Sequence, residues 1–366
     1  PARAGRNCLS RPMTASAFDH PWLSGLFGDA EMGALWSAQT QLEHMLAFEA
    51  AWSQAGAAVG LWPQDQGDKA ALAIKTAKIA PADLRAGTGR DGVCVPDLVQ
   101  HLRALVGEGA LHVGATSQDV VDTATSLSIS ASLKLIAERL GALDRALSEL
   151  ENRFGAQPLM GRTRMQAAVM IKVVDRISPW RLPLHDHQNR ISALMPRVAR
   201  VQIGGAAGDR AALGAKAQPF VDHMAKSLGL AATERSWHAM RDGIGEFASL
   251  LSLVTGNLGK IGQDVALMAQ QGLDEISLSG GGRSSAMAHK RNPVLAELLV
   301  TLARFNAVQL SGMHHALLHE QERSGAAWGL EWMILPQMAQ STGRALVATL
   351  ELVGSIEHIG TLQENS

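Results

Sequence analysis

Residues 247–268 read FASLLSLVTGNLGKIGQDVALM and carry the clearest structural pattern in the chain. Their apolar side chains recur at alternating steps of four and three, which places them along one face of a helix. Residues 129–154 repeat this pattern. At a rise of 1.5 Å per residue, each helix is expected to be roughly 40 Å long. The two apolar seams comprise Phe247, Leu251, Val254, Leu258, Ile261, Val265 and Met268, and Ile129, Leu133, Ile136, Leu140, Leu143, Leu147, Leu150 and Phe154. The sequence therefore predicts an all-α protein built on a bundle of long helices.

Proline placement agrees with long helices. Proline, which breaks helices, is absent between Pro96 and Pro158 and again between Pro219 and Pro293. Strand signals are scarce, because the chain has no tyrosine and no turn dipeptides between alternating segments. Three further helices are expected, over residues 29–60, 184–204 and 294–320.

Gly256, Gly259 and Gly262 lie opposite the apolar seam of residues 247–268. A glycine inside a helix costs about 1 kcal/mol relative to alanine, so three of them need an explanation. We expect them to allow another helix to approach closely. The alternative is a slightly weak surface helix.

Composition excludes several classes of protein. The 366 residues are 46% hydrophobic and carry a net charge of −1, so the chain lacks the cationic field of a nucleic-acid or membrane-surface protein. No uninterrupted apolar run approaches the roughly 18 residues of a membrane span. Cys8 and Cys94 are far apart and show no metal-ligand spacing, so neither a disulfide framework nor a metal site is expected. A reducing cytoplasm is the expected location.

The organisation expected along the chain has four segments. The arginine-rich start is interpreted as a leader or a vector-derived scar and is excluded from fold reasoning. The segments are the leader at 1–12, an N-terminal helical domain at 13–108, a central long-helix bundle at 109–340 and a short C-terminal tail at 341–366.

Three polar stretches interrupt the helices. Residues 112–119, HVGATSQD, directly precede the helix that carries the seam of residues 129–154. Ser117 or Asp119 can cap this helix, and the helix N-terminus can attract an anion. A plain capping loop explains this stretch equally well. Residues 161–166, GRTRMQ, place two arginines and an amide near an expected helix start, a set that suits carboxylate binding, although a solvated basic turn is the simpler interpretation.

The third stretch, residues 280–293, reads GGGRSSAMAHKRNP. Three glycines make a loop that is costly in backbone entropy, and serines and cationic residues follow them directly. A loop of this kind between two long helices favours a functional role over a linker.

Together the three stretches resemble the signature regions of the fumarase/aspartase superfamily. The third is similar to the family's Ser-Ser-x-Met-Pro-x-Lys-x-Asn-Pro signature. The resemblance extends from about Phe18 to Leu335. Residues 202–208, 237–242 and 320–332 most resemble the bacterial 3-carboxy-cis,cis-muconate cycloisomerase branch.

The resemblance implies a fumarase/aspartase-like bundle that forms a 20-helix core in a cytoplasmic homotetramer, with each active site drawn from three chains. It implies no metal and no organic cofactor. The expected reaction of this branch is lactone formation from 3-carboxy-cis,cis-muconate, or from a 3-sulfo analogue, in aromatic-compound degradation through the β-ketoadipate pathway. The substrate is thus a small polyanion, a tricarboxylate or a sulfo-dicarboxylate. The apolar seams also look too extensive for one subunit to cover, which favours a partner.

The resemblance also implies roles for individual residues. Ser284 is the expected acid/base, and Lys290 and Asn292 are expected to hold the substrate carboxylate and the developing charge, with Glu297 nearby. The expected substrate-binding residues are His112, Thr116, Ser117, Arg162, Thr163, Arg164, Gln166, Arg283, Ser285, His289 and Arg323.

The chain departs from the family at several points. Arg164 stands where many lyases of the family have a histidine that serves as general acid, and arginine stays protonated. We therefore expect Arg164 to pair with Glu297 or to bind a substrate anion, and we favour a cycloisomerase over an adenylosuccinate- or argininosuccinate-type lyase. Arg283 replaces a glycine and adds a cation, which together with Arg164 suggests that a 3-sulfo group could be bound, and Ala288 replaces the signature proline. The family's small C-terminal domain is expected to be reduced or missing.

Several other residues allow alternatives. A catalytically silent helical scaffold explains the seams but not the intact serine, lysine, asparagine and glutamate set. The clustered histidines, His314, His315 and His319, do not share a helix face well and are interpreted as surface or interface residues. Substrate binding is favoured for His238 and Arg241 over helix capping, and core positions are expected for Trp328 and Trp332.

Overall fold

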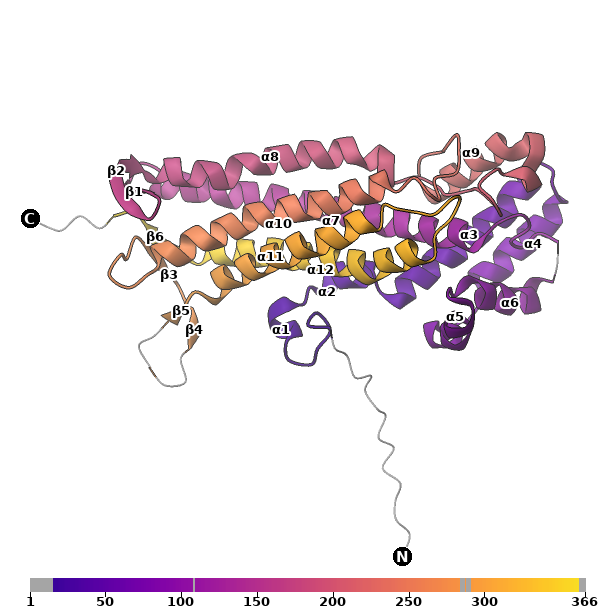
Figure 1. The fold of residues 1–366 in the computed structure, drawn as a ribbon, viewed down its shortest axis with the longest axis horizontal. Helices are drawn as coiled ribbons and strands as arrows, with labels where there is room; N and C mark the ends of the chain where they lie inside the picture. Colours follow the sequence, from indigo (N-terminus) through magenta and orange to yellow (C-terminus); the bar gives the residue numbers. More distant parts are fainter. Residues whose placement is uncertain (1–15, 108, 284–286, 288–290, 362–366) are drawn as a thin grey trace, which may run out of the picture.

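The computed structural model describes residues 16–107, 109–283, 287 and 291–361. Five long helices run side by side and form an elongated bundle (Figure 1). They are α7 (Ser117–Phe154), α8 (Val173–Val198), α10 (Asp242–Met268), α11 (Val294–His315) and α12 (Ala326–Gly354). Helix α10 packs against α8, α11 and α12, and α7 packs against α8 and α12. The predicted all-α bundle of long helices is confirmed.

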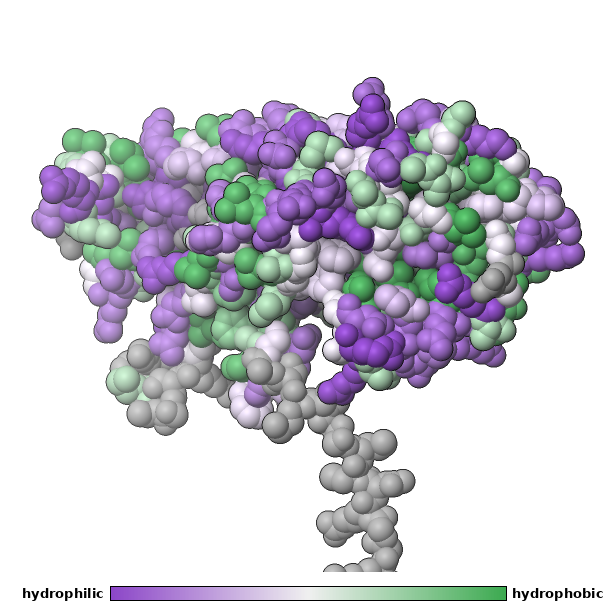
Figure 2. All heavy atoms as spheres, turned by 45° about the vertical axis from the view of Figure 1, so that its right-hand side comes forward, coloured by the Kyte–Doolittle hydropathy of each residue, from purple (hydrophilic) through white to green (hydrophobic). Residues whose placement is uncertain are grey.

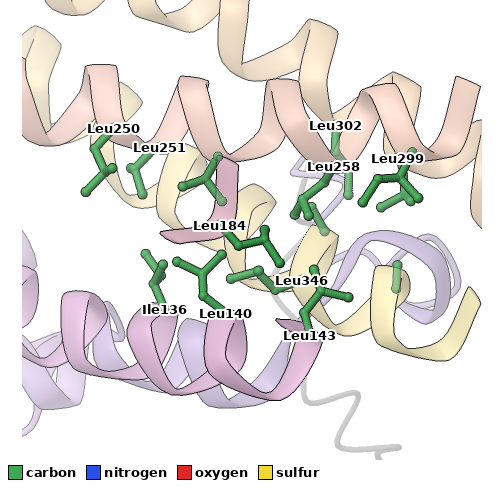
Figure 3. Packing of buried hydrophobic residues seen from close by; sticks show 14 of the residues in the cluster. Ile136, Leu140, Leu143, Leu184, Leu250, Leu251, Leu258, Leu299, Leu302 and Leu346 are labelled. Carbon is green, nitrogen blue, oxygen red and sulfur yellow. The ribbon is translucent and has the colours of Figure 1, made fainter. Parts of the chain in front are cut away.

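Both predicted seams lie in the core of this bundle. All their members are at most 2% exposed, apart from Phe154, which is partly buried at the end of α7. Figure 3 shows Leu140 and Leu143 of α7 pointing toward Leu184 of α8 and Leu346 of α12. One chain therefore covers its own seams. The expectation that these seams require a partner subunit is wrong, because α8 and α12 provide the cover.

The glycines of α10 permit a close approach to α11. A Cβ on Gly259 would lie 2.6 Å from the Ala303 Cβ, and one on Gly262 would lie 2.5 Å from the Ala296 carbonyl oxygen. At Gly256 nothing lies within 4 Å. Close approach is confirmed for the first two glycines, whereas Gly256 faces open space in the single chain.

A second group of helices packs around the start of α7. It comprises α3 (Ala38–Ala58), α4 (Gln64–Lys75), α5 (Arg85–Asp91), α6 (Val95–Val106) and α9 (Ala217–Leu228), with the 3-10 helices η1 (Pro81–Leu84) and η2 (Ala211–Lys216). Apart from α5, these elements share a second hydrophobic core with the first turns of α7. The short helices α1 (Ser24–Phe27) and α2 (Ala30–Leu35) lie beside the bundle, and α2 contacts α7 and α12.

Several boundaries differ from those expected. Helix α8 begins at Val173 rather than near residue 184, because Pro179 and Pro183 lie inside it instead of ending it. Helix α12 continues past residue 340 to Gly354 and keeps most of that extension buried, so residues 341–354 belong to the bundle rather than to a tail. The helix expected over 29–60 is divided into α2 and α3, and Ser37 caps α3 by accepting from the N–H of Thr40.

Three two-stranded sheets lie at one end of the bundle (Figure 1). They are formed by β1 (Pro158–Thr163) with β2 (Gln166–Lys172), β3 (Ile276–Leu278) with β6 (Ile356–Ile359), and β4 (Gly282–Arg283) with β5 (Arg291–Asn292). The first is a hairpin whose two-residue turn places Arg164 and Met165 at φ 48° and 67°. Side chains are uncommon at positive φ, so this sequence gives no ordinary turn signal. The expectation that residues 161–166 begin a helix is wrong.

The surface of the bundle is unusually apolar in places. By length and composition α7 and α11 could each cross a membrane, a test that the buried core helix of a globular protein also passes. The most apolar window of α7 is 56% buried, but that of α11 is only 28% buried. Val308 of α11, Leu318 after it and Met333 of α12 are 72%, 76% and 69% exposed. Figure 2 shows hydrophobic patches between hydrophilic residues on the side turned toward the viewer.

Candidate active site

The first polar stretch forms the turn that leads into α7. Thr116 is the N-cap residue, and its backbone N–H donates to Asp119 Oδ2 at 3.0 Å. Ser117 is the first residue of the helix. Asp119 is therefore the capping carboxylate, one of the two candidates that the sequence suggested. Thr116 and Ser117 remain partly exposed at the helix N-terminus, where backbone N–H groups favour an anion.

Asp119 also ties a glycine-rich segment to the start of α7. It is fully buried and accepts from the N–H groups of Gly204 and Gly205 at 2.8 and 3.0 Å. His238 Nε2 lies 2.8 Å from Asp119 Oδ1, the oxygen that also accepts from Gly204. Because His238 is only 2% exposed, it supports the turn from behind and does not reach a substrate, contrary to the binding role favoured from the sequence.

Arg241 lies in a buried ion cluster one turn further along α7. Its guanidinium pairs with Asp122 at 2.7 Å and with Glu331 of α12, and Trp328 donates to the same aspartate at 3.0 Å. Burial alone would lower the pKa of Arg241, but the two carboxylates raise it above its ordinary value. The side chain is 1% exposed, so the expected substrate contact is wrong and the residue joins α7, α10 and α12.

The loop between α11 and α12 reaches the same turn. Arg323 donates to the Thr116 hydroxyl, which places a cation beside the α7 N-terminus. His319 has a fully buried side chain 3.6 Å from Glu331, so of the two positions expected, surface or interface, a surface position is excluded. Trp328 is a core residue as expected, whereas Trp332 is 37% exposed.

His112 lies in this turn with its Nδ1 atom 2.6 Å from Glu49 Oε1. Glu49 belongs to α3 and is fully buried. Sequence reasoning missed this carboxylate. Its only signal is a charged residue within the otherwise apolar run LAFEAAW at residues 46–52.

The second polar stretch forms the β1–β2 hairpin. Arg162 pairs with the buried Glu275, with its Nη1 atom 2.5 and 2.6 Å from the two carboxylate oxygens. It therefore anchors the hairpin within the chain. Thr163, Arg164 and Gln166 are exposed around the turn. A cavity of about 610 Å³ lies against this hairpin, and its lining includes Arg162, Arg164, Met165, Arg176, Lys260 and Glu275.

The third polar stretch begins and ends in a small hairpin. Gly282 pairs with Asn292, and the backbone of Arg283 pairs with that of Arg291. Glu297 is exposed in the first turn of α11. No ion pair joins it to Arg164 within the described part of this chain, so pairing across subunits stays a prediction. Four predicted site residues, Ser284, Ser285, His289 and Lys290, lie outside the described residues, as do Ala288, Cys8 and the segment at 1–12.

The chain separates the three stretches. The first lies at the start of α7 and the hairpin follows its end, and 38 residues of helix span about 57 Å. The β1–β2 hairpin and the β4–β5 hairpin both lie at the end of the bundle far from the α7 N-terminus (Figure 1). One chain brings Thr116, Ser117, His112 and Arg323 together, but it does not bring them to Arg164 or Asn292.

Comparisons with known proteins identify relatives of this chain and of its fold. A family model described as "Lyase" matches residues 31–308. A 3-carboxy-cis,cis-muconate cycloisomerase of Acinetobacter baylyi is 34% identical over 91% of this chain and 76% of the relative. The solved 3-carboxy-cis,cis-muconate lactonizing enzyme of Pseudomonas putida matches with a TM-score of 0.86 and 34% identity, over 92% of this chain and 77% of that structure. A fumarate lyase from Mesorhizobium matches with a TM-score of 0.85 and 31% identity, over 91% and 76% of the two chains. The chain therefore belongs to this lyase family and is an enzyme of the fumarase/aspartase superfamily.

Proposed function

We propose that this enzyme is a cytoplasmic cycloisomerase that converts 3-carboxy-cis,cis-muconate, or its 3-sulfo analogue, to the corresponding muconolactone. The observation that carries the proposal is the likeness, over nine tenths of the chain, to enzymes named for this reaction. Arg164 supports it, because a permanent cation stands where the lyases of the family use a proton-donating histidine. Closure of a lactone by a carboxylate needs no such donor, since the attacking group is already an anion.

The proposed step is an internal addition in which the substrate anion takes up one proton and loses no atom. One substrate carboxylate forms a C–O bond to the conjugated double bond, and the electron pair moves onto the carbon alpha to the other carboxylate. The Ser284 hydroxyl gives its proton to that carbon, and its alkoxide form is stabilised by loop N–H groups and by Lys290 before solvent restores the proton. Asn292, Thr116 and Ser117 hold the substrate carboxylates.

We propose that these residues meet in a homotetramer. Thr116 and Arg164 are separated by α7, whose 38 residues span about 57 Å, so a site that uses both must draw on more than one subunit. The mostly exposed apolar face of α11 supports this assembly. So does the hairpin, where Met165, Val169 and Met170 are 71%, 67% and 52% exposed. Apolar surfaces of this kind mark interfaces.

The group at position 3 of the substrate could be a carboxylate or a sulfonate. Arg164 is exposed at the hairpin tip, and the cavity beside it also receives Arg176 and Lys260, although Lys260 is paired with Asp264. An extra anionic group, carboxylate or sulfonate, fits such a cationic surface. Comparing kcat/KM for 3-carboxymuconate and 3-sulfomuconate decides between them, and a strong preference for the carboxylate would rule out the sulfonate.

The test of the function is an ultraviolet assay in which lactone formation removes the absorbance of the conjugated diene. Wild type is expected to turn over 3-carboxy-cis,cis-muconate, and Ser284→Ala is expected to lose that activity. Ser279→Ala is the matched control, because this serine precedes the loop and, among the described residues, its hydroxyl donates only to the Ser355 carbonyl at 3.2 Å. No turnover of either muconate, together with release of fumarate from adenylosuccinate or argininosuccinate, would overturn the proposal in favour of a lyase.

A further inference from the structure

The turn that carries His112 is held by one face of α3. Ser53 donates to the Ala110 carbonyl at 2.9 Å, Glu49 contacts His112 at 2.6 Å, and Trp52 donates to the Val113 carbonyl at 3.2 Å. Three neighbouring side chains of one helix therefore fix the backbone on both sides of His112 and the ring itself. A turn attached at three points cannot be a freely moving loop.

His112 is held in a conformation that few residues adopt. Its φ is 56°, in the left-handed region, where a side chain is disfavoured unless the surroundings impose it. The ring keeps 14% exposure on the outer side of the turn. Because Nδ1 faces Glu49, Nε2 is the ring nitrogen left to meet a substrate. Next along the chain are Thr116 and Ser117, at the N-terminus of α7.

The burial of Glu49 is not explained by packing. Its side chain has no exposed surface, and its Oε2 atom has no hydrogen-bond partner in the described part of the chain. A buried carboxylate is costly unless a cation compensates it. His112 is the only ion-pair partner that Glu49 has among the described residues. The pair is therefore satisfied electrostatically when the imidazole carries its proton.

We propose that Glu49 is a positioning residue that keeps His112 as an imidazolium, with Nδ1 fixed and Nε2–H directed at an anionic group of the substrate. This inference rests on the proposed function for the identity of the anion, but not for the state of the histidine. The inference gives residues 112–119 a fixed cation, His112, in a chain where Arg164 stands in place of the histidine that many relatives have in the second stretch.

The charges around His112 agree with this role. Burial opposes protonation, but the charge and contact of Glu49 of α3 and the charge of Asp119 of α7 together outweigh it, so the pKa of His112 is raised above its ordinary value. Arg103 of α6 acts in the opposite direction and more weakly. A His–carboxylate pair that is formed before the substrate arrives needs no reorganisation during binding.

The test measures the titration of His112 directly. Exchange of the imidazole C2 hydrogen for deuterium, read by mass spectrometry of the peptide that contains His112, gives the pKa of this histidine in the intact protein. Glu49→Gln keeps the shape but removes the charge, and the midpoint is expected to fall by about one pH unit or more. Glu49→Asp should restore part of the shift. Ser53→Ala is the matched control, because it removes another tie between α3 and the same turn without removing a charge.

Kinetics then test the role of the cation. Near neutral pH, Glu49→Gln is expected to lower kcat/KM roughly tenfold, mainly through a higher KM, and acidification should recover the loss because it restores the proton. A purely structural role predicts a loss that pH does not recover, and it predicts no change in the exchange midpoint. An unchanged midpoint in Glu49→Gln overturns the inference. If wild type turns over neither muconate, the proposed function fails, while the exchange experiment still decides whether Glu49 controls His112.

Discussion

Replacing Gly262 by alanine tests the packing that fixes the start of α11. The new Cβ would lie 2.5 Å from the Ala296 carbonyl oxygen and 2.8 Å from the Leu299 Cβ. Neither atom can rotate away, so the two helices must separate, and such overpacking costs about 1–3 kcal/mol. Alanine also returns about 1 kcal/mol of helix propensity. The net expectation is a loss of stability of up to about 2 kcal/mol.

Gly256→Ala is the matched control on the same helix. Nothing lies within 4 Å of its Cβ position, so the substitution should stabilise the protein by about 1 kcal/mol. The difference between the two variants isolates the overpacking cost, and urea unfolding followed by circular dichroism measures it. Because α11 begins two residues after Asn292, Gly262→Ala should also lower kcat more than the control does. Equal stability changes in the two variants would refute the close approach of α10 and α11.

Three further predictions concern buried charge and the hairpin. Arg241→Met leaves Asp122 and Glu331 buried without their arginine and should cost about 3–5 kcal/mol. Arg197→Met breaks an exposed pair and should cost about 0–1 kcal/mol, and equal losses in urea unfolding would contradict this. Burial, aided by a neighbouring arginine, lowers the pKa of His187 from 6.5 to about 4, so the unfolded chain takes up this proton first and stability should fall as the pH drops through that interval. His187→Gln should lose this part of the dependence, and a slope like that of wild type would refute it. Arg164→His should lower the ratio of 3-sulfomuconate to 3-carboxymuconate turnover, and an unchanged ratio would exclude Arg164 from contact with the 3-substituent.

Helical periodicity predicted α7 and α10 well, because a face that is buried along its whole length must repeat at helical spacing. Periodicity says nothing about what covers that face, and the cover proved to be α8 and α12 of the same chain. The start of α8 was predicted too late in the chain, because Pro179 and Pro183 are accommodated inside the helix instead of preceding it. A single chain instead leaves apolar surface exposed on α11 and on the β1–β2 hairpin.

The site was predictable where local chemistry marks it. Asp119 was recognisable as a cap because its position relative to the expected helix start is a local feature. The hairpin was not, because Arg164 and Met165 are an unusual pair for a turn with two positive φ values. Glu49 could not be assigned either, since 63 residues separate it from His112 and only the packing of α3 against the turn brings them together.

The central claim is that one active site draws residues from several chains. Ser117→Ala and Ser284→Ala are each expected to be nearly inactive in the ultraviolet assay, because each removes a different stretch from every site. When the two variants are dissociated, mixed in equal amounts and reassembled, roughly a quarter of the sites should receive both stretches intact, and activity should return to about that level. Hybrid tetramers that form, as native mass spectrometry can verify, but stay inactive would contradict the claim.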